Sequence, residues 1–109
     1  MTDTLQVLGQ YSPAANSLYT LYTVPAVTSS VVSSIMICNT NSSSVTFRVS
    51  VAIGGTIDAI SQYIYYDLPL LANDTFVATI GVSLATTDQI RVQASATNVA
   101  FTISGVQIT

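Results

Sequence analysis

The side chains that most often carry catalysis are scarce in this sequence. It has no His, no Lys and no Glu, and Cys38 is its single cysteine. General bases, amine nucleophiles and zinc ligands are therefore mostly missing. The acidic residues are five aspartates: Asp3, Asp58, Asp67, Asp74 and Asp88. This composition predicts a protein that is not an enzyme and that binds neither a cofactor nor a metal ion.

Two of the aspartates could in principle act as a carboxylate pair of the kind that glycosidases use. Asp74 and Asp88, however, lie in turn sequences, where Asp commonly hydrogen-bonds to its own backbone. Asp58 follows the pair Gly54-Gly55, but the segment lacks a second carboxylate and the spacing and lysine of a phosphate-binding loop. We interpret these segments as turns and strand connections.

The low charge limits the possible partners. Arg48 and Arg91 are the only basic residues, and a net charge of -3 repels phosphates. Polar residues interrupt every apolar run before the roughly 18 residues that a membrane-spanning helix needs. The first residues lack the cationic and apolar segments of a signal peptide. We expect no nucleic-acid partner, no membrane partner and no secretion by a signal peptide. Cys38 cannot form a disulfide within the chain, and we expect a small buried thiol.

Hydrophobic residues recur with a period of two, which is typical of strands with one buried and one solvated face. The pattern is clearest in residues 44–53, where the predicted inner face holds Val45, Phe47, Val49, Val51 and Ile53. The predicted strands span residues 4–10, 18–24, 30–38, 44–53, 62–67, 76–82, 90–94 and 99–103. Their number and spacing predict an all-β fold, a single antiparallel β-sandwich that is jelly-roll-like with about eight short strands. Residues 18–109 form the predicted sandwich domain, and residues 1–17 an N-terminal arm or a first strand.

The densest aromatic cluster follows Gln62. Tyrosine combines a large apolar ring with a polar tip, which suits protein interfaces, sugar-binding grooves and the open edge of a core. Strand alternation places Ile64 and Tyr66 on one face, and the other tyrosines with Asp67 on the opposite face. The candidate protein–protein interface consists of Tyr63, Tyr65, Tyr66 and Asp67.

The predicted sheets lack the charges that usually protect exposed strand edges from pairing with other chains. Ser, Thr and Val also lose comparatively little side-chain entropy when they are ordered at a contact. We therefore expect neighbouring subunits to cover the edges and one face.

Five short segments, taken in order, carry a family resemblance: Leu21–Ala26, Ile37–Thr40, Val45–Val49, Tyr63–Asp67 and Ala72–Thr75. They resemble a group of small virion structural proteins of tailed bacteriophages, especially cyanophages. The resemblance extends over residues 18–108 and leaves the N-terminal arm unmatched. Val27 departs from the glycine that often follows Pro-Ala in this group.

The resemblance implies a capsid cement or decoration protein that binds the outer surface of the major capsid lattice and stabilises it. Its implied partner is the major capsid protein, its implied oligomer a homotrimer, and its implied location the virion, assembled in the host cytoplasm. The alternative is a tail, fibre or baseplate module for receptor or carbohydrate binding.

Overall fold

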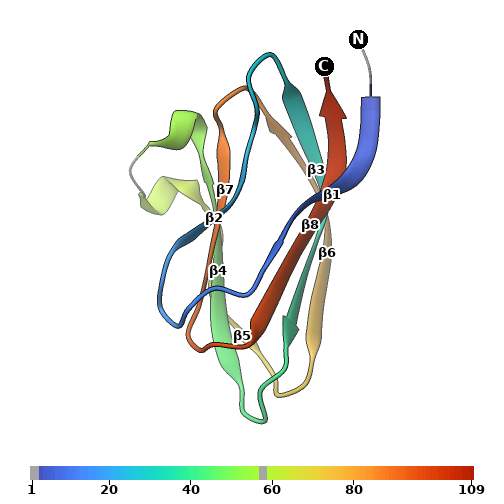
Figure 1. Ribbon diagram of the computed structural model, residues 1–109. Helices are drawn as coiled ribbons and strands as arrows, with labels where there is room; N and C mark the ends of the chain where they lie inside the picture. Colours follow the sequence, from blue (N-terminus) through green and yellow to red (C-terminus); the bar gives the residue numbers. More distant parts are fainter. Residues whose placement is uncertain (1–2, 57–58) are drawn as a thin grey trace.

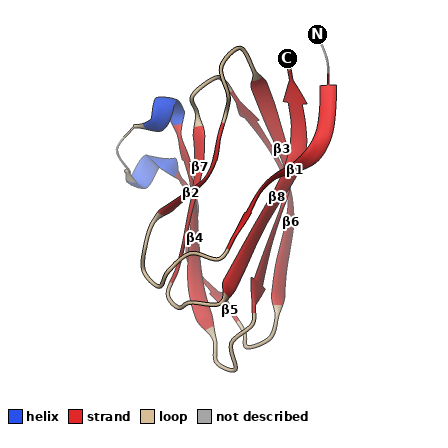
Figure 2. Cartoon of the chain, viewed as in Figure 1, coloured by secondary structure: helices blue, strands red, loops and turns tan. Residues whose placement is uncertain are grey.

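Eight β-strands form two antiparallel four-stranded sheets in the computed structural model, which describes residues 3–56 and 59–109 (Figure 1, Figure 2). The strands are β1 (Asp3–Tyr11), β2 (Tyr19–Thr23), β3 (Ser29–Asn39), β4 (Val45–Ala52), β5 (Tyr63–Leu70), β6 (Thr75–Leu84), β7 (Gln89–Ala94) and β8 (Val99–Ile108). Two single-turn 3₁₀ helices, η1 (Ile53–Gly55) and η2 (Ile60–Gln62), lie between β4 and β5. In the described part of the chain, no helix has the length and hydrophobicity needed to cross a membrane.

The strand order identifies the type of sandwich. The first sheet has the order β1-β8-β3-β6 and the second the order β2-β7-β4-β5. The chain passes from one sheet to the other at every connection except that between β4 and β5, which gives the jelly-roll arrangement. The predicted antiparallel β-sandwich of eight strands is confirmed.

The core lies between the two sheets and is built by the alternating residues of the central strands. In β4, Phe47 and Val49 are buried, and in β8 the same is true of Phe101 and Ile103. Ile53 does not follow the predicted pattern, because the chain leaves the sheet at η1 and the side chain is 71% exposed.

Strand β1 lies at the edge of the first sheet and pairs with β8, from Asp3 opposite Ile108 to Tyr11 opposite Phe101. Residues 3–11 of the segment predicted as an arm or a first strand are therefore strand. At the end of β1, the ring of Tyr11 stacks on that of Tyr19 in β2, with 4.0 Å between ring centroids.

An irregularity crosses the first sheet and requires a glycine. The register shifts between Val32 and Ser34 in both of β3's pairings. At this point Gly105 of β8 approaches β3 so closely that a Cβ atom would lie 1.9 Å from the carbonyl oxygen of Val31. At Gly81 of β6, by contrast, no atom lies within 4 Å of the place that a Cβ atom would take.

These two glycines give a matched test of the register. Gly105→Ala must displace the β3 backbone, and we expect it to lower the free energy of unfolding by about 1–3 kcal/mol or more, as overpacking does. Gly81→Ala meets no atom and should leave stability unchanged or raise it by about 0.4–1 kcal/mol. Urea unfolding measures both, and equal effects of the two substitutions would contradict the β3–β8 register.

The position of Phe47 predicts a large cost of truncation. Its side chain is 1% exposed and contacts the rings of Tyr65 and Phe76. Phe47→Ala should lower the free energy of unfolding by about 3–5 kcal/mol. Val77→Ala, at an exposed β6 position, should stay within about 0.5 kcal/mol of the wild type in the same urea titration. A loss below about 1 kcal/mol for Phe47→Ala would show that this face of β4 is not the inner one.

Candidate interaction site on the outer face of the second sheet

The four residues of the candidate interface lie on β5, at the edge of the second sheet, where the strand pairs with β4 alone. Leu68 pairs with Phe47 and Tyr65 pairs with Val49, so that two residues of β5 stand opposite Arg48. These two residues are Tyr66 and Asp67. Such an extra residue is a β-bulge, and Asp67 has the positive φ of 51° at this point.

The bulge changes which side chains reach the surface. Tyr65 stays between the sheets, with ring centroids 6.1 Å from Phe47 and 5.2 Å from Phe76. Tyr66 and Asp67 both point to the outer face, where Arg48 lies. Simple alternation placed Tyr63 and Asp67 on the same face as Tyr65. That placement is wrong for both, because the register with β4 shifts on each side of Tyr65, between Phe47 and Val49 and again between Val49 and Ser50. The structure therefore brings together Tyr63, Tyr66 and Asp67, and separates Tyr65 from them.

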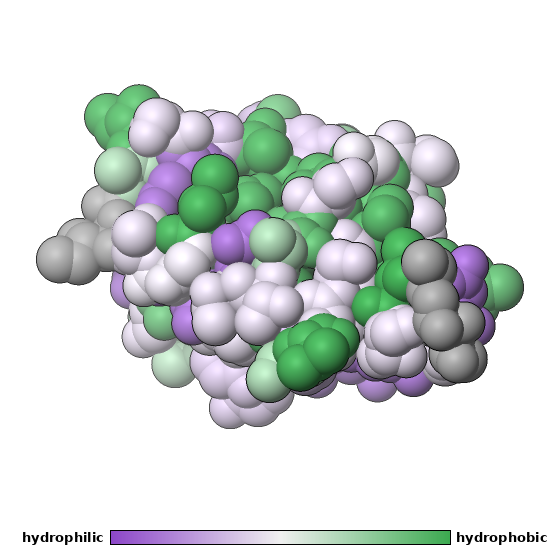
Figure 3. Space-filling model, turned by 90° about the horizontal axis from the view of Figure 1, so that it is seen from above, coloured by the Kyte–Doolittle hydropathy of each residue, from purple (hydrophilic) through white to green (hydrophobic). Residues whose placement is uncertain are grey.

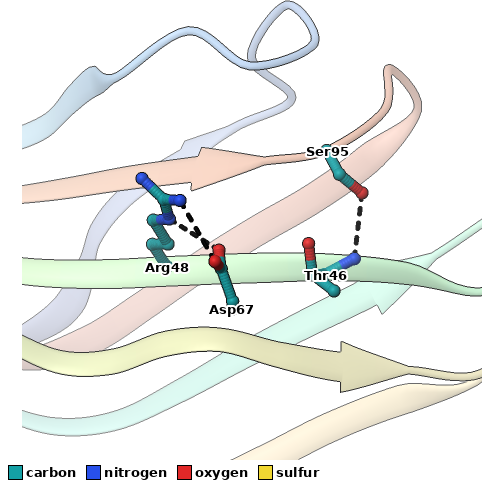
Figure 4. Close-up of polar contacts among 4 residues, drawn as sticks. All are labelled: Thr46, Arg48, Asp67 and Ser95. Carbon is teal, nitrogen blue, oxygen red and sulfur yellow. Dashed lines mark hydrogen bonds and ion pairs between the residues drawn. The ribbon is translucent and has the colours of Figure 1, made fainter.

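Arg48 links these surface residues. Its Nε and Nη2 donate to the two carboxylate oxygens of Asp67 at 2.6 and 3.1 Å (Figure 4). Its guanidinium carbon also lies 4.2 Å from the ring centroid of Tyr66, a cation–π geometry. The ring of Tyr66 in turn meets the edge of Tyr63 with 4.9 Å between centroids. Arg48 thus holds both residues of the bulge in place.

The contact between Arg48 and Asp67 shifts the pKa values of both groups. The hydrogen bonds from Arg48 hold the pKa of the Asp67 carboxyl below its ordinary value of 3.8, against the opposing effect of desolvation. The hydrogen bond to Asp67 raises the pKa of the Arg48 guanidinium in the same way. Both groups stay charged at neutral pH, and their charges compensate each other.

A polar pocket of about 170 Å³ lies beside this ion pair. Thr46 and Arg48 contribute from β4, Gln93 from β7, and Asn16 and Ser95 from the loops after β1 and β7. The Oγ atom of Ser95 accepts a hydrogen bond from the backbone N–H of Thr46 at 2.9 Å, which fixes one wall (Figure 4). Sequence patterns identified none of these partners, because the pocket depends on pairing between β4 and β7.

A second hollow, of about 280 Å³, is lined by Ile60, Tyr63 and Tyr66. It is mainly apolar, and Tyr66, which lines it, also contacts Arg48 of the polar pocket. The outer face of this sheet edge therefore presents a polar pocket and an apolar hollow that share one arginine–tyrosine contact.

Two other aspartates from the sequence analysis, Asp74 and Asp88, accept hydrogen bonds from backbone N–H groups. Asp88 is buried and its carboxylate accepts from the backbone N–H groups of Gly54 and Ala85 at 2.8 and 2.9 Å. Asp74 accepts from the N–H of Thr75 at 2.8 Å. The local bonds from Thr75 to Asp74 and from Ala85 to Asp88 match the turn interpretation, whereas the bond from Gly54 joins Asp88 to the distant helix η1. Asp58 lies outside the described residues, and within those residues no three His, Cys, Asp or Glu side chains gather as a metal site.

Cys38 differs from its expected burial. The side chain is only partly buried, because β3 alternates and the neighbouring Ile37 and Asn39 occupy the inner face. Cys38 therefore points to the outer face of the first sheet.

The ion pair predicts a specific pH dependence. The folded-state pKa of Asp67 lies below the unfolded value, so its stabilisation is present above that unfolded value and is lost as the pH falls through the folded pKa. Arg48→Gln should move the pKa of Asp67 upward toward 3.8, as measured by NMR titration of the carboxyl carbon. Arg91→Gln, which removes the other arginine of this sheet, should leave it unchanged. Identical titration of Asp67 in the wild type and Arg48→Gln would contradict the pair.

No protein-family model matches this chain, and no curated protein matches it. Among solved structures, the chain is similar to a protein chain in the structure of infectious bursal disease virus, Gx strain, with a TM-score of 0.55 and 15% sequence identity. The similarity covers 97% of this chain and 32% of the viral chain, so this protein spans about a third of that neighbour. At this identity the likeness concerns the fold alone.

Proposed function

We propose that this chain is a structural protein of a virus particle, and specifically a cement or decoration protein on the outer surface of a tailed-bacteriophage capsid. The observation that carries the proposal is the outer face of the sheet β1-β8-β3-β6, which is almost free of charge. Surfaces of this kind need a partner, because single-molecule surfaces usually keep charged side chains to prevent association.

The uncharged face can be followed from strand to strand. One row of cross-strand neighbours contains Leu5, Val106, Val31 and Ser83, and another contains Gln10, Thr102, Met36 and Val77. Leu5 is 82% exposed and Val77 is 63% exposed. Asp3, at the first position of β1, is the one charged residue in the described strands of this sheet.

The view from above looks onto the end of the sandwich that holds both termini. Pale side chains of intermediate hydropathy and hydrophobic groups cover most of this end, and few side chains in the view are strongly hydrophilic (Figure 3).

The two edges of this sheet also favour association. Strands β1 and β6 each pair on one side only, and neither contains a Lys, an Arg or a Pro. These are residues by which natural sheets block edge-to-edge contact. We infer that neighbouring copies cover this sheet, and that a homotrimer is the unit that binds the capsid.

The fold supports the same class of function. Jelly rolls are a recurrent architecture of viral capsids, and the similar chain comes from a virus structure. In this proposal the major capsid protein is the partner and the virion is the location. Because such a protein binds only the assembled shell, it would stabilise that shell by mass action.

A module of a tail, fibre or baseplate is the second candidate. The polar pocket and the apolar hollow of the second sheet favour it, because a receptor-binding module needs a concave site with convergent polar groups. This candidate predicts a few copies per particle, whereas the cement predicts a fixed ratio to the major capsid protein.

The location is tested by quantitative mass spectrometry of purified particles. We expect a high copy number in fixed ratio to the major capsid protein. Copies confined to isolated tails would favour the second candidate, and absence from the particles would contradict both.

The uncharged face is tested by introducing a cation. Leu5→Lys places a charge in the proposed contact, where burial without a partner is costly, and should convert the trimer to a monomer in sedimentation velocity. Thr23→Lys, at an exposed position of β2 in the second sheet, adds the same charge and should leave the trimer intact. A monomeric wild type, or a trimer that tolerates Leu5→Lys, would contradict an interface on this face.

A further inference from the structure

We propose that the polar pocket and the apolar hollow beside the β5 bulge form two adjoining subsites for a neutral saccharide. The proposal does not depend on where in a virus the protein resides. It rests on three properties of the outer face of the second sheet: open hydrogen-bonding groups, compensated charge, and an exposed aromatic ring.

The polar pocket has hydrogen-bonding capacity that the protein does not use. Among the described residues, the side chains of Asn16, Thr46 and Gln93 have no hydrogen-bond partner, although all three line the pocket. A carboxamide offers two donors and an acceptor, and a hydroxyl offers one donor with two lone pairs. The hydroxyl groups of a sugar both donate and accept, so they match this mixture. Each Asp67 oxygen, with one bond from Arg48, can accept a further bond.

The charge of the site selects a neutral ligand. Arg48 is held by both oxygens of Asp67, a bidentate geometry that is among the strongest side-chain pairings. Arg91, the other arginine, donates to the carbonyl groups of Gly55 and Thr56 and to the side chain of Gln89. An anionic ligand would have to displace Asp67 or remain beside it, and like charges in contact repel. A phosphate, sulfate or carboxylate ligand is therefore disfavoured.

The apolar hollow supplies the complementary surface. Tyr66 is 55% exposed and lines the hollow with Ile60 and Tyr63. A sugar ring has one face of C–H groups, which packs on an aromatic ring, while its hydroxyl groups point outward to polar partners. A saccharide placed across the contact between Arg48 and Tyr66 would meet an apolar surface at one ring and hydrogen-bonding groups at the next.

Contacts within the protein hold Arg48 and Tyr66 in place before any ligand arrives. The guanidinium of Arg48 covers one part of the Tyr66 ring and the edge contact with Tyr63 orients it. Arg48 stands on the central strand β4, which pairs on both sides. A site held on paired strands loses little conformational entropy on binding.

The test is an NMR titration of the full chain with defined saccharides. Lactose, maltotriose, cellotriose and chitotriose serve as neutral probes, and 3′-sialyllactose serves as the acidic counterpart of lactose. We expect saturable shifts of amide resonances at residues 46–48, 66–67 and 93–95 with at least one neutral probe, and weaker binding of sialyllactose than of lactose.

Variants then separate the two subsites. Gln93→Ala removes a polar group of the pocket and Tyr66→Ala removes the aromatic surface, and each should weaken binding about tenfold, the effect of one lost hydrogen bond or ring contact. Gln10→Ala, on the outer face of the first sheet, is the matched control and should bind as the wild type does. If Gln93→Ala perturbs the spectrum of the free protein, Asn16→Gly removes another pocket side chain while allowing the positive φ of 56° at that residue.

The proposal is overturned by any of four results: no saturable shift with any neutral probe, shifts confined to other residues, tighter binding of sialyllactose than of lactose, or binding unaffected by both Gln93→Ala and Tyr66→Ala.

Discussion

The structure depends on burying the inward residues of two sheets against each other. Each large aliphatic or aromatic side chain removed from water contributes about 1.5–3 kcal/mol, and Phe47 and Phe101 are among the largest fully buried ones. Because β4 and β8 belong to different sheets, this burial forces the sheets to face each other. It also decides which residues of each strand remain at the surface. The two outer faces, with their different chemistry, are a consequence of that single constraint.

The two sheets differ in the number of charged residues on their described strands, with Arg48, Asp67 and Arg91 in the second and Asp3 in the first. Both arginines lie on strands of the second sheet, where Asp67 compensates Arg48 and backbone carbonyl groups hold Arg91. The described strands of the first sheet carry one charged residue, Asp3. One protein can therefore use one face for packing with neighbours and leave the other accessible. In a virion component, this division would keep a ligand site open while the opposite sheet is covered by neighbouring subunits.

The β5 bulge connects the fold to the candidate site. Without it, alternation would place Asp67 on the inner face with Tyr65, where an unpaired carboxylate is costly. The extra residue keeps Tyr65 in the aromatic cluster with Phe76 and moves Asp67 to the side of Arg48. Bulges often re-aim side chains at sheet edges. The bulge therefore keeps a charged side chain out of the core and, at the same place, brings Asp67 within hydrogen-bonding distance of Arg48.

The sequence by itself determined the strands, the inner faces of β4 and β8, and the tyrosine-rich segment, because a period of two is a local property that each strand carries alone. Arg48 could be placed on an outer face for the same reason. The polar pocket could not be predicted, since Asn16 and Gln93 are far apart in the chain and meet only through sheet pairing. Strand order and the bulge likewise depend on which strands become neighbours. Tertiary structure alone decided these features, because the free energy that selects them comes from contacts between distant segments.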